Sequence, residues 1–245
     1  MVRETSPRRS GPAPGRPAVV GGLTVAIAVA AALLTDVVAA GGRPTAVDEA
    51  VHRFTREWAD SVGWVVTAAE FLGRVTGPLV SVCYAAVVFA VLATRRSWAI
   101  ALFVGISAAS GALAVEIVKL AVSRPRPPGA IRYVTDLDLS FPSGHAAAGI
   151  YLYLVLGLIA VRHGRAVGAR RMTILGLFLL VLGPVIGLSR IVLGVHWASD
   201  VAAGWAFGSA AALTAALLVW EPLARSWGSR SRARPADAPA ASEGG

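Results

Sequence analysis

The segment LSFPSGHAAAGIYLYLVLGLIA, from Leu139 to Ala160, combines a membrane-like run with a polar start. Most of it is an apolar run long enough to cross the ~30 Å hydrocarbon core of a bilayer as a helix. The run opens with residues of a different kind, Pro142, Ser143, Gly144 and His145. A histidine at the mouth of a membrane helix is costly unless it has a partner or a chemical role. The polar opening therefore indicates a functional site at the start of this helix.

The whole chain has the composition of an integral membrane protein. Of its 245 residues, 56% are hydrophobic and only 15% are charged, whereas soluble domains carry about a quarter charged residues. The apolar runs long enough to span a membrane are Ala18–Ala40, Val75–Thr94, Trp98–Ala121, Phe141–Val161, Met172–Leu188 and Ala198–Trp220. We therefore predict an all-α, polytopic membrane protein with six transmembrane helices in a bundle.

The segments outside these runs predict a single domain with two tails. Residues 1–17 and 225–245 are predicted to be disordered, because they are rich in Pro, Gly, Ala and Arg, and they flank one domain at 18–224. The first apolar run is expected to be retained, since it is too long for a typical signal peptide and has no clear cleavage site. Residues 45–72 mix charges with aromatic residues, which predicts an amphipathic helix or pair of helices at the membrane interface.

The positive charges predict the orientation in the membrane. The net charge is +9, but the basic residues form short clusters between apolar runs and no continuous stripe, so nucleic acid is not expected as a partner. The segments on the side of both termini carry 14 Lys and Arg residues, against nine on the other side. The positive-inside rule then places both termini in the cytoplasm. The start of the fourth run and the loops after the third and fifth face outward.

Three short segments are expected to meet on that outer face. They are KLAVSRPRP at 119–127, FPSGH at 141–145 and SRIVLGVHWASD at 189–200. Each begins or ends an apolar run, so all three lie at one membrane depth. Together they collect lysine and arginine side chains, hydroxyls and backbone amides. Such fixed cations and donors suit a tetrahedral anion, and phosphate fits best.

The second of these segments is predicted to form half of a phosphate cradle. Pro142 suits the first turn of a helix. Ser143, Gly144 and His145 would then present backbone N–H groups at a helix N-terminus, where an anion is favoured. Gly144 would let the phosphate approach the backbone closely.

The third segment carries a histidine and an aspartate four residues apart. His196 and Asp200 share a face if the start of the last apolar run is helical. A carboxylate on one imidazole nitrogen fixes the tautomer and leaves the other nitrogen free to attack phosphorus. His145 is then placed to protonate the leaving oxygen and later to activate water. No metal or other cofactor is expected, because cations outnumber metal ligands in these segments.

The three segments together resemble the type 2 phosphatidic acid phosphatase (PAP2) superfamily, which includes membrane lipid phosphatases, bacterial undecaprenyl-diphosphate phosphatases and soluble acid phosphatases. The resemblance rests on Lys-x6-Arg-Pro, Pro-Ser-Gly-His and Ser-Arg-x5-His-x3-Asp, and covers about Trp98 to Trp220. It implies three catalytic roles: His196 as nucleophile, Asp200 as its orienting partner and His145 as general acid. The phosphate binders that it implies are Lys119, Arg126, Ser143, Gly144 and Arg190.

The expected function is hydrolysis of a lipid phosphate or diphosphate without a metal, through a phosphohistidine. Undecaprenyl diphosphate is favoured by family analogy, and phosphatidic acid or phosphatidylglycerol phosphate is the alternative. A non-catalytic phospholipid-binding protein would keep the cations but could dispense with His196 and Asp200. A lipid phosphotransferase would carry the same motifs, so the sequence leaves it open.

Several other residues are expected to have no catalytic role. Cys83 is the only cysteine and lies within an apolar run, so we expect a buried small hydrophobe and no disulfide. His52 and His163 are predicted to be solvated surface residues. For Asp136 and Asp138 in the outer loop, solvation is favoured over a role in discouraging doubly charged head groups. Glu116 lies one turn before the lysine of the first motif and is expected to pair with it, and the sequence leaves open whether it tunes the lysine or only neutralises it.

Overall fold

The computed structural model describes residues 15–128 and 139–224, and this part of the chain is helical without a β-strand. The helices are α1 (Arg16–Ala39), α2 (Ala46–Ser61), α3 (Gly63–Val75), α4 (Pro78–Thr94), α5 (Trp98–Val122), α6 (Gly144–Ala148), a π-helical segment η1 (Gly149–Leu154), α7 (Val155–Val167), α8 (Arg170–Val192) and α9 (Ala198–Leu218). The all-α prediction is therefore confirmed. Most of both predicted tails falls outside the described residues, although Arg16 and Pro17 already belong to α1.

Among residues 15–128 and 139–224, five helical stretches are long and apolar enough to cross a membrane. They are α1, α5, α8, α9 and the continuous stretch from α6 to α7. The predicted run Val75–Thr94 is the exception, because α4 has only 17 residues. It meets the same criteria only together with α3, and the two helices are bent by 50° relative to each other. The break is local: Thr76 ends α3, Gly77 precedes α4, and Pro78 occupies a first-turn position that suits proline.

The segment predicted to be amphipathic forms the two helices α2 and α3, as expected. Thr45 caps α2, because its Oγ1 accepts the backbone N–H of Asp48 at 3.1 Å. The Asp48 carboxylate returns the bond by accepting the backbone N–H of Thr45 at 3.1 Å. Such reciprocal caps satisfy two backbone donors and fix where the helix begins.

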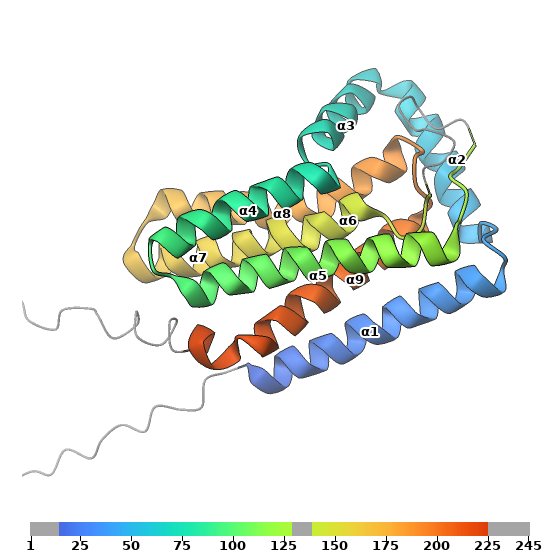
Figure 1. The fold of residues 1–245 in the computed structure, drawn as a ribbon. Helices are drawn as coiled ribbons and strands as arrows, with labels where there is room; N and C mark the ends of the chain where they lie inside the picture. Colours follow the sequence, from blue (N-terminus) through green and yellow to red (C-terminus); the bar gives the residue numbers. More distant parts are fainter. Residues whose placement is uncertain (1–14, 129–138, 225–245) are drawn as a thin grey trace, which may run out of the picture.

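The long helices form a bundle, and α2 and α3 cover one of its ends (Figure 1). Helix α5 packs against α4 and α9, α1 runs along α9, and α7 packs against α8. The end covered by α2 and α3 is the one where α5 ends and where α6 and α9 begin. All three predicted motifs therefore lie at this end.

Glycines allow the inner helices to approach backbone to backbone. A Cβ on Gly149 would lie 2.2 Å from the carbonyl oxygen of Gly183, and a Cβ on Gly183 would lie 2.5 Å from that of Gly149. On α9, a Cβ on Gly204 would lie 2.4 Å from the carbonyl oxygen of Ser143. Small residues at helix contacts are typical of membrane bundles, where close packing stabilises association. The contact at Gly204 also holds the start of α6 against α9.

We expect Gly183→Ala to destabilise the bundle, because the new methyl group has no room beside Gly149. Overpacking of this kind costs ~1–3 kcal/mol. Gly21→Ala is the matched control, since a Cβ at this helical position meets nothing within 4 Å. Thermal unfolding of both variants in detergent would check this. A midpoint for Gly183→Ala equal to that of Gly21→Ala would contradict the packing argument.

The prediction for Cys83 is wrong, because the side chain is exposed on the outside of α4. The buried residues of α4 are Ser81 and Ala85, which are four positions apart and share one face. Cys83 lies midway between them and therefore points away from the bundle.

Candidate active site

The three motif segments meet at the covered end of the bundle. Ser140 donates its backbone N–H to the carbonyl oxygen of Arg124 at 2.8 Å, which joins the first segment to the second. Ser143 donates its backbone N–H to the carbonyl oxygen of Asp200 at 2.9 Å, which joins the second to the third. The juxtaposition expected from the sequence is therefore present in the structure.

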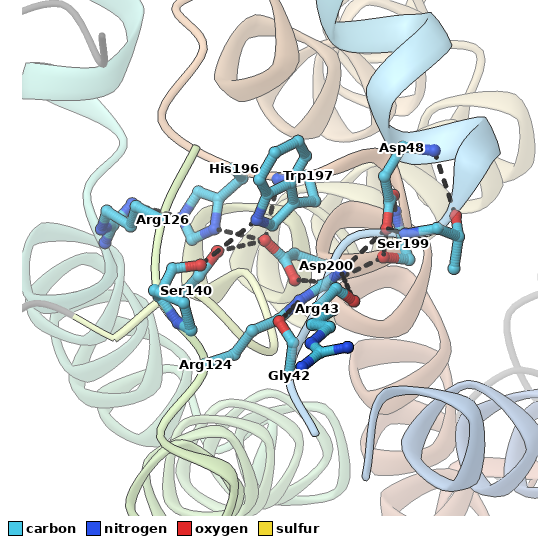
Figure 2. A network of polar contacts seen from close by, with 12 residues as sticks. Gly42, Arg43, Asp48, Arg124, Arg126, Ser140, His196, Trp197, Ser199 and Asp200 are labelled. Carbon is cyan, nitrogen blue, oxygen red and sulfur yellow. Dashed lines mark hydrogen bonds and ion pairs between the residues drawn. The ribbon is translucent and has the colours of Figure 1, made fainter. Parts of the chain in front are cut away.

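His196 lies at the centre of this cluster, between an arginine and an aspartate (Figure 2). The side chain is buried, with 3% of its surface exposed. Its Nε2 accepts a hydrogen bond from Arg126 Nη1 at 3.1 Å. Its Nδ1 lies 3.6 Å from Asp200 Oδ2, which is longer than a hydrogen bond, and has no hydrogen-bond partner within the described part of the chain. The imidazole thus presents one nitrogen to a cation and turns the other toward a carboxylate.

The expected reason for this pairing is wrong. His196 and Asp200 do not share a helical face, because α9 begins at Ala198 and His196 precedes it. Asp200 lies in the first turn of α9, and its Oδ2 reaches back to accept the backbone N–H of Trp197 at 2.8 Å. This cap at the helix start brings the carboxylate toward the imidazole.

Asp200 is fully buried and surrounded by donors. Its Oδ1 accepts a hydrogen bond from Arg124 Nη1 at 2.6 Å. Its Oδ2 accepts from the Ser140 hydroxyl, in addition to the backbone N–H described above. A carboxylate accepts but does not donate, so this set of partners matches the charged form of Asp200.

The surroundings keep His196 uncharged. The pKa of His196 is lowered to about 4: burial is the main cause, the charges of Arg126 and Lys119 act in the same direction, and the Asp200 carboxylate opposes them. The imidazole is therefore neutral at neutral pH. Because Nε2 accepts from Arg126, the proton of the neutral ring belongs on Nδ1, the nitrogen that faces Asp200.

We expect His196 to remain unprotonated well below the ordinary histidine pKa. NMR titration of the protein labelled at histidine Cε1, with His196→Ala used to assign the signal, should give a midpoint near pH 4. Unfolded histidine titrates near pH ~6.5. The unfolded chain therefore binds more protons between these two pH values, so the stability contributed by this group is complete above pH ~6.5 and is lost as the pH falls toward the folded pKa. A midpoint near that of free histidine would contradict the assignment.

His145 and Arg190 are both held by backbone carbonyl groups of α3. His145, in the first turn of α6, donates from Nε2 to the carbonyl oxygen of Gly73 at 3.2 Å. Arg190, buried on α8, donates from Nη2 to the carbonyl oxygen of Ala69 at 2.6 Å. A Cβ on Gly73 would meet the guanidinium of Arg190, so a larger residue at this position would have to displace that group.

These two residues lie in the same cluster as His196. His145 is close enough to His196, Arg126 and Arg190 for their charges to interact. The backbone of Arg190 also accepts the N–H of Val195, the residue before His196, at 3.1 Å. The site is therefore one continuous group of cations and imidazoles.

Ser143 and Gly144, two further expected phosphate binders, already make close contacts within the protein. Ser143 gives its N–H to Asp200, and its hydroxyl accepts from Ala146 N at 3.4 Å as the cap of α6. Pro142 precedes this cap and so does not lie in the first helical turn. A Cβ on Gly144 would lie 3.0 Å from Pro78 Cγ, so this glycine packs closely against α4.

Lys119 lies in the last turn of α5, at the end of the bundle that holds the other motifs. As expected, it pairs with Glu116, at 3.7 Å between Nζ and Oε1. It is also close enough to His196 for its charge to act on the imidazole.

A buried ionic group that the sequence did not predict lies beside His196. Arg124 is fully buried and contacts two carboxylates, those of Asp200 at 2.6 Å and Asp48 at 2.8 Å. Arg124 lies two positions before Arg126, within the first motif segment, but its sequence position does not distinguish a buried structural cation from a phosphate binder. No local pattern marked Asp48, which is 76 residues away along the chain.

Two histidines outside the motifs are less solvated than predicted. His52 is partly buried, and its ring centroid lies 5.5 Å from that of Trp197. His163, near the end of α7, is also partly buried. The expectations for Asp136 and Asp138 fall outside the described residues.

A metal site does not emerge from the residues that the structure describes. Within 15–128 and 139–224, no group of three or more His, Cys, Asp or Glu side chains is arranged to hold a metal ion. Reaction without a metal remains a prediction.

Comparison with known proteins places the chain among phosphatases. The family model described as the PAP2 superfamily matches residues 100–223. The decaprenylphosphoryl-5-phosphoribose phosphatase of Mycobacterium tuberculosis (strain ATCC 25618 / H37Rv) is 32% identical over 151 residues, which cover 60% of this chain and 67% of that protein. Phosphatidylglycerophosphatase B of Bacillus subtilis (strain 168) is 30% identical over 93 residues, 38% of this chain and 45% of that protein.

A solved membrane protein has a similar fold. The crystal structure of a transmembrane PAP2-type phosphatidylglycerolphosphate phosphatase from Bacillus subtilis matches with a TM-score of 0.62 and 20% identity, over 82% of this chain and 94% of that chain. This match and the apolar helices confirm the prediction of a polytopic, all-α membrane protein.

Proposed function

The chain belongs to the PAP2 superfamily, and on this basis we propose that it hydrolyses a phosphate group from a membrane lipid through a covalent phosphohistidine on His196. The observation that carries the proposal is the state of His196. Its uncharged ring offers Nε2 beside Arg126 Nη1 at 3.1 Å and is backed by Asp200 on the other side. A neutral imidazole next to a fixed cation suits attack on a phosphate that the cation binds.

In the first step, the Nε2 lone pair of His196 forms a bond to phosphorus while the bond from phosphorus to the lipid oxygen breaks. His145 takes part in this step as an imidazolium, protonated on both ring nitrogens. The leaving oxygen takes the proton of its Nε2, the atom that now donates to the carbonyl oxygen of Gly73, and His145 becomes a neutral imidazole. The imidazole of His196 carries positive charge once phosphorylated, and the Asp200 carboxylate at 3.6 Å stabilises that charge.

In the second step, water attacks the phosphoryl group and gives its proton to His145. The bond from Nε2 to phosphorus breaks, inorganic phosphate leaves, and both histidines return to their starting state. Through both steps the phosphate oxygens are bound by the cations Lys119, Arg126 and Arg190. Ser143 and Gly144 complete the proposed phosphate site at the start of α6. Positioned cations of this kind supply most of the stabilisation in phosphoryl transfer.

For the substrate, we favour a phosphate on a polyprenyl-linked lipid. The support is that relatives sharing about two thirds of their length with this chain are named decaprenylphosphoryl-5-phosphoribose phosphatases. Undecaprenyl diphosphate, favoured from the sequence, belongs to the same class of lipid. A glycerolipid phosphate is the second candidate, because phosphatidylglycerophosphatase B is also similar. We also propose that both termini are cytoplasmic and that the site opens on the extracytoplasmic interface, following the distribution of arginines.

Phosphate release by the purified protein in detergent would test this function. Decaprenylphosphoryl-5-phosphoribose, undecaprenyl diphosphate and phosphatidylglycerophosphate would be offered in parallel with EDTA present, and His196→Ala would serve as the inactive control. Release from a lipid by the wild type alone is the expected result. Phosphorylated acceptor without free phosphate would identify a transferase. Lipid binding without turnover, by a folded protein, would identify a binding protein.

A further inference from the structure

We propose that Asp48, on α2, is a positioning residue for the nucleophile and acts through Arg124 and Ser199. This inference rests on the proposed function of His196. Asp48 lies in the first turn of α2, which is outside the residues matched by the family model. Its side chain nevertheless reaches the segment that carries His196, as Figure 2 shows.

The Asp48 carboxylate is buried and accepts hydrogen bonds from several groups of the protein. It is 1% exposed. Its Oδ1 accepts the backbone N–H of Ser199 at 2.9 Å, and its Oδ2 accepts the Ser199 hydroxyl at 2.8 Å and Arg124 Nη2 at 2.8 Å. A helix cap needs only the bond to Thr45, so the remaining contacts require another explanation.

Arg124 joins two carboxylates, those of Asp48 and Asp200, inside the protein. Nη1 donates to Asp200 Oδ1 at 2.6 Å and to Ser199 Oγ at 2.7 Å, while Nη2 donates to Asp48. Nε and Nη2 also donate to the carbonyl oxygens of Gly42 and Arg43, each at 3.3 Å. The guanidinium is fully buried and surrounded by these acceptors, so it orients Asp200 and does not serve as a phosphate ligand.

The groups that Asp48 and Arg124 bind lie close to His196 along the chain. Ser199 lies between His196 and Asp200, at the start of α9. Asp48 fixes its backbone N–H and its hydroxyl, and Arg124 fixes the carboxylate of the next residue. The first turn of α9, directly after His196, is thereby tied to α2 by charge-assisted bonds, which are the strong ones. This arrangement sets where the imidazole of His196 stands relative to the phosphate.

The test compares Asp48→Asn with Thr45→Ala. Both variants weaken the start of α2, but Thr45→Ala leaves the bonds to Arg124 and Ser199 in place. We expect Asp48→Asn to lower kcat by ~10–100-fold, because small displacements of a reacting group are costly. KM and the inhibition constant of inorganic phosphate should stay within about threefold, since the phosphate-binding cations are untouched. Thr45→Ala should keep kcat within about threefold of the wild type. Equal losses in the two variants would overturn the proposal.

A second readout does not depend on turnover. The labelled His196 resonance should move in Asp48→Asn and stay in place in Thr45→Ala. An unmoved resonance in Asp48→Asn would overturn the inference. A wild-type chain that released no phosphate, with the resonance still displaced in Asp48→Asn, would count against the proposed function alone.

Two further variants guard against misfolding and against a merely structural effect. If Asp48→Asn does not fold, Ser199→Ala removes the hydroxyl between Asp48 and Arg124 and keeps every charge. It should lower kcat by ~3–10-fold at constant KM, and an unchanged kcat would refute the proposal. When Asp48→Asn is added to the Asp200→Asn variant, it should lower kcat by less than about threefold, because the two residues act through one path. Fully additive losses would also refute it.

Discussion

Replacement of His196 with alanine is expected to reduce phosphate release by at least ~10⁴-fold, as removal of a nucleophile does in other covalent enzymes. The protein should remain folded, because among the residues that the structure describes the imidazole hydrogen-bonds only to Arg126, through Nε2. Free phosphate and the thermal midpoint would be measured together. His163→Ala is the matched control, since His163 lies near the end of α7, away from the motifs.

The covalent intermediate gives this prediction a sharper form. An aryl phosphate with a good leaving group does not need a proton from His145 in the first step, although the water still needs a base in the second. His145→Ala should therefore accumulate an acid-labile phosphoenzyme with such a substrate, and His196→Ala should not. Phosphate bound to the His196→Ala variant in the same assay would mean that another residue is the nucleophile.

Asp200→Asn is expected to have the second largest effect, because it acts on both activity and stability. Loss of the carboxylate removes the group that selects the Nδ1–H tautomer, and a wrong tautomer costs ~10⁴-fold in a comparable histidine–aspartate pair. It also leaves Arg124 fully buried with one carboxylate partner fewer. Breaking a buried ion pair costs ~3–5 kcal/mol.

Two measurements would check the effects of Asp200→Asn, namely kcat and the thermal midpoint in detergent. Asp60→Asn is the matched control, because Asp60 pairs with Arg56 at 3.9 Å and its side chain is 72% exposed. Such exposed pairs contribute ~0–1 kcal/mol. A stable Asp200→Asn protein with near wild-type kcat would contradict both the orienting role and the energetic importance of the buried network.

Much of the fold could be predicted because membrane spans are recognisable in a sequence as long apolar runs. Helices α1, α5, α8 and α9 lie close to their predicted runs. The predicted start of the second span at Val75 is wrong, because hydropathy does not reveal the bend between Val75 and Pro78. Cys83 was misplaced for a related reason: an apolar side chain on a membrane helix can face lipid as comfortably as the protein core.

The site was predictable where the motifs are local, and not where distant backbone or buried charge completes it. Arg126 and His196 were named from the sequence, and they lie in contact. The carbonyl groups of Ala69 and Gly73 have no signature, since every residue has a carbonyl. Asp48 meets Arg124 only through tertiary folding, and a single aspartate at a helix start is ordinarily explained by capping alone.

The carbonyl groups of α3 have a consequence for how tightly any phosphate can be bound. Arg190 and His145 already have acceptors there, at 2.6 Å and 3.2 Å. Binding of a phosphate oxygen to either side chain is therefore an exchange of one acceptor for another, and the net gain is only the difference between the two bonds. A doubly charged phosphate wins this competition against a neutral carbonyl, because charged hydrogen bonds are stronger. The same competition works in favour of product release, since α3 offers each side chain a replacement partner as inorganic phosphate departs.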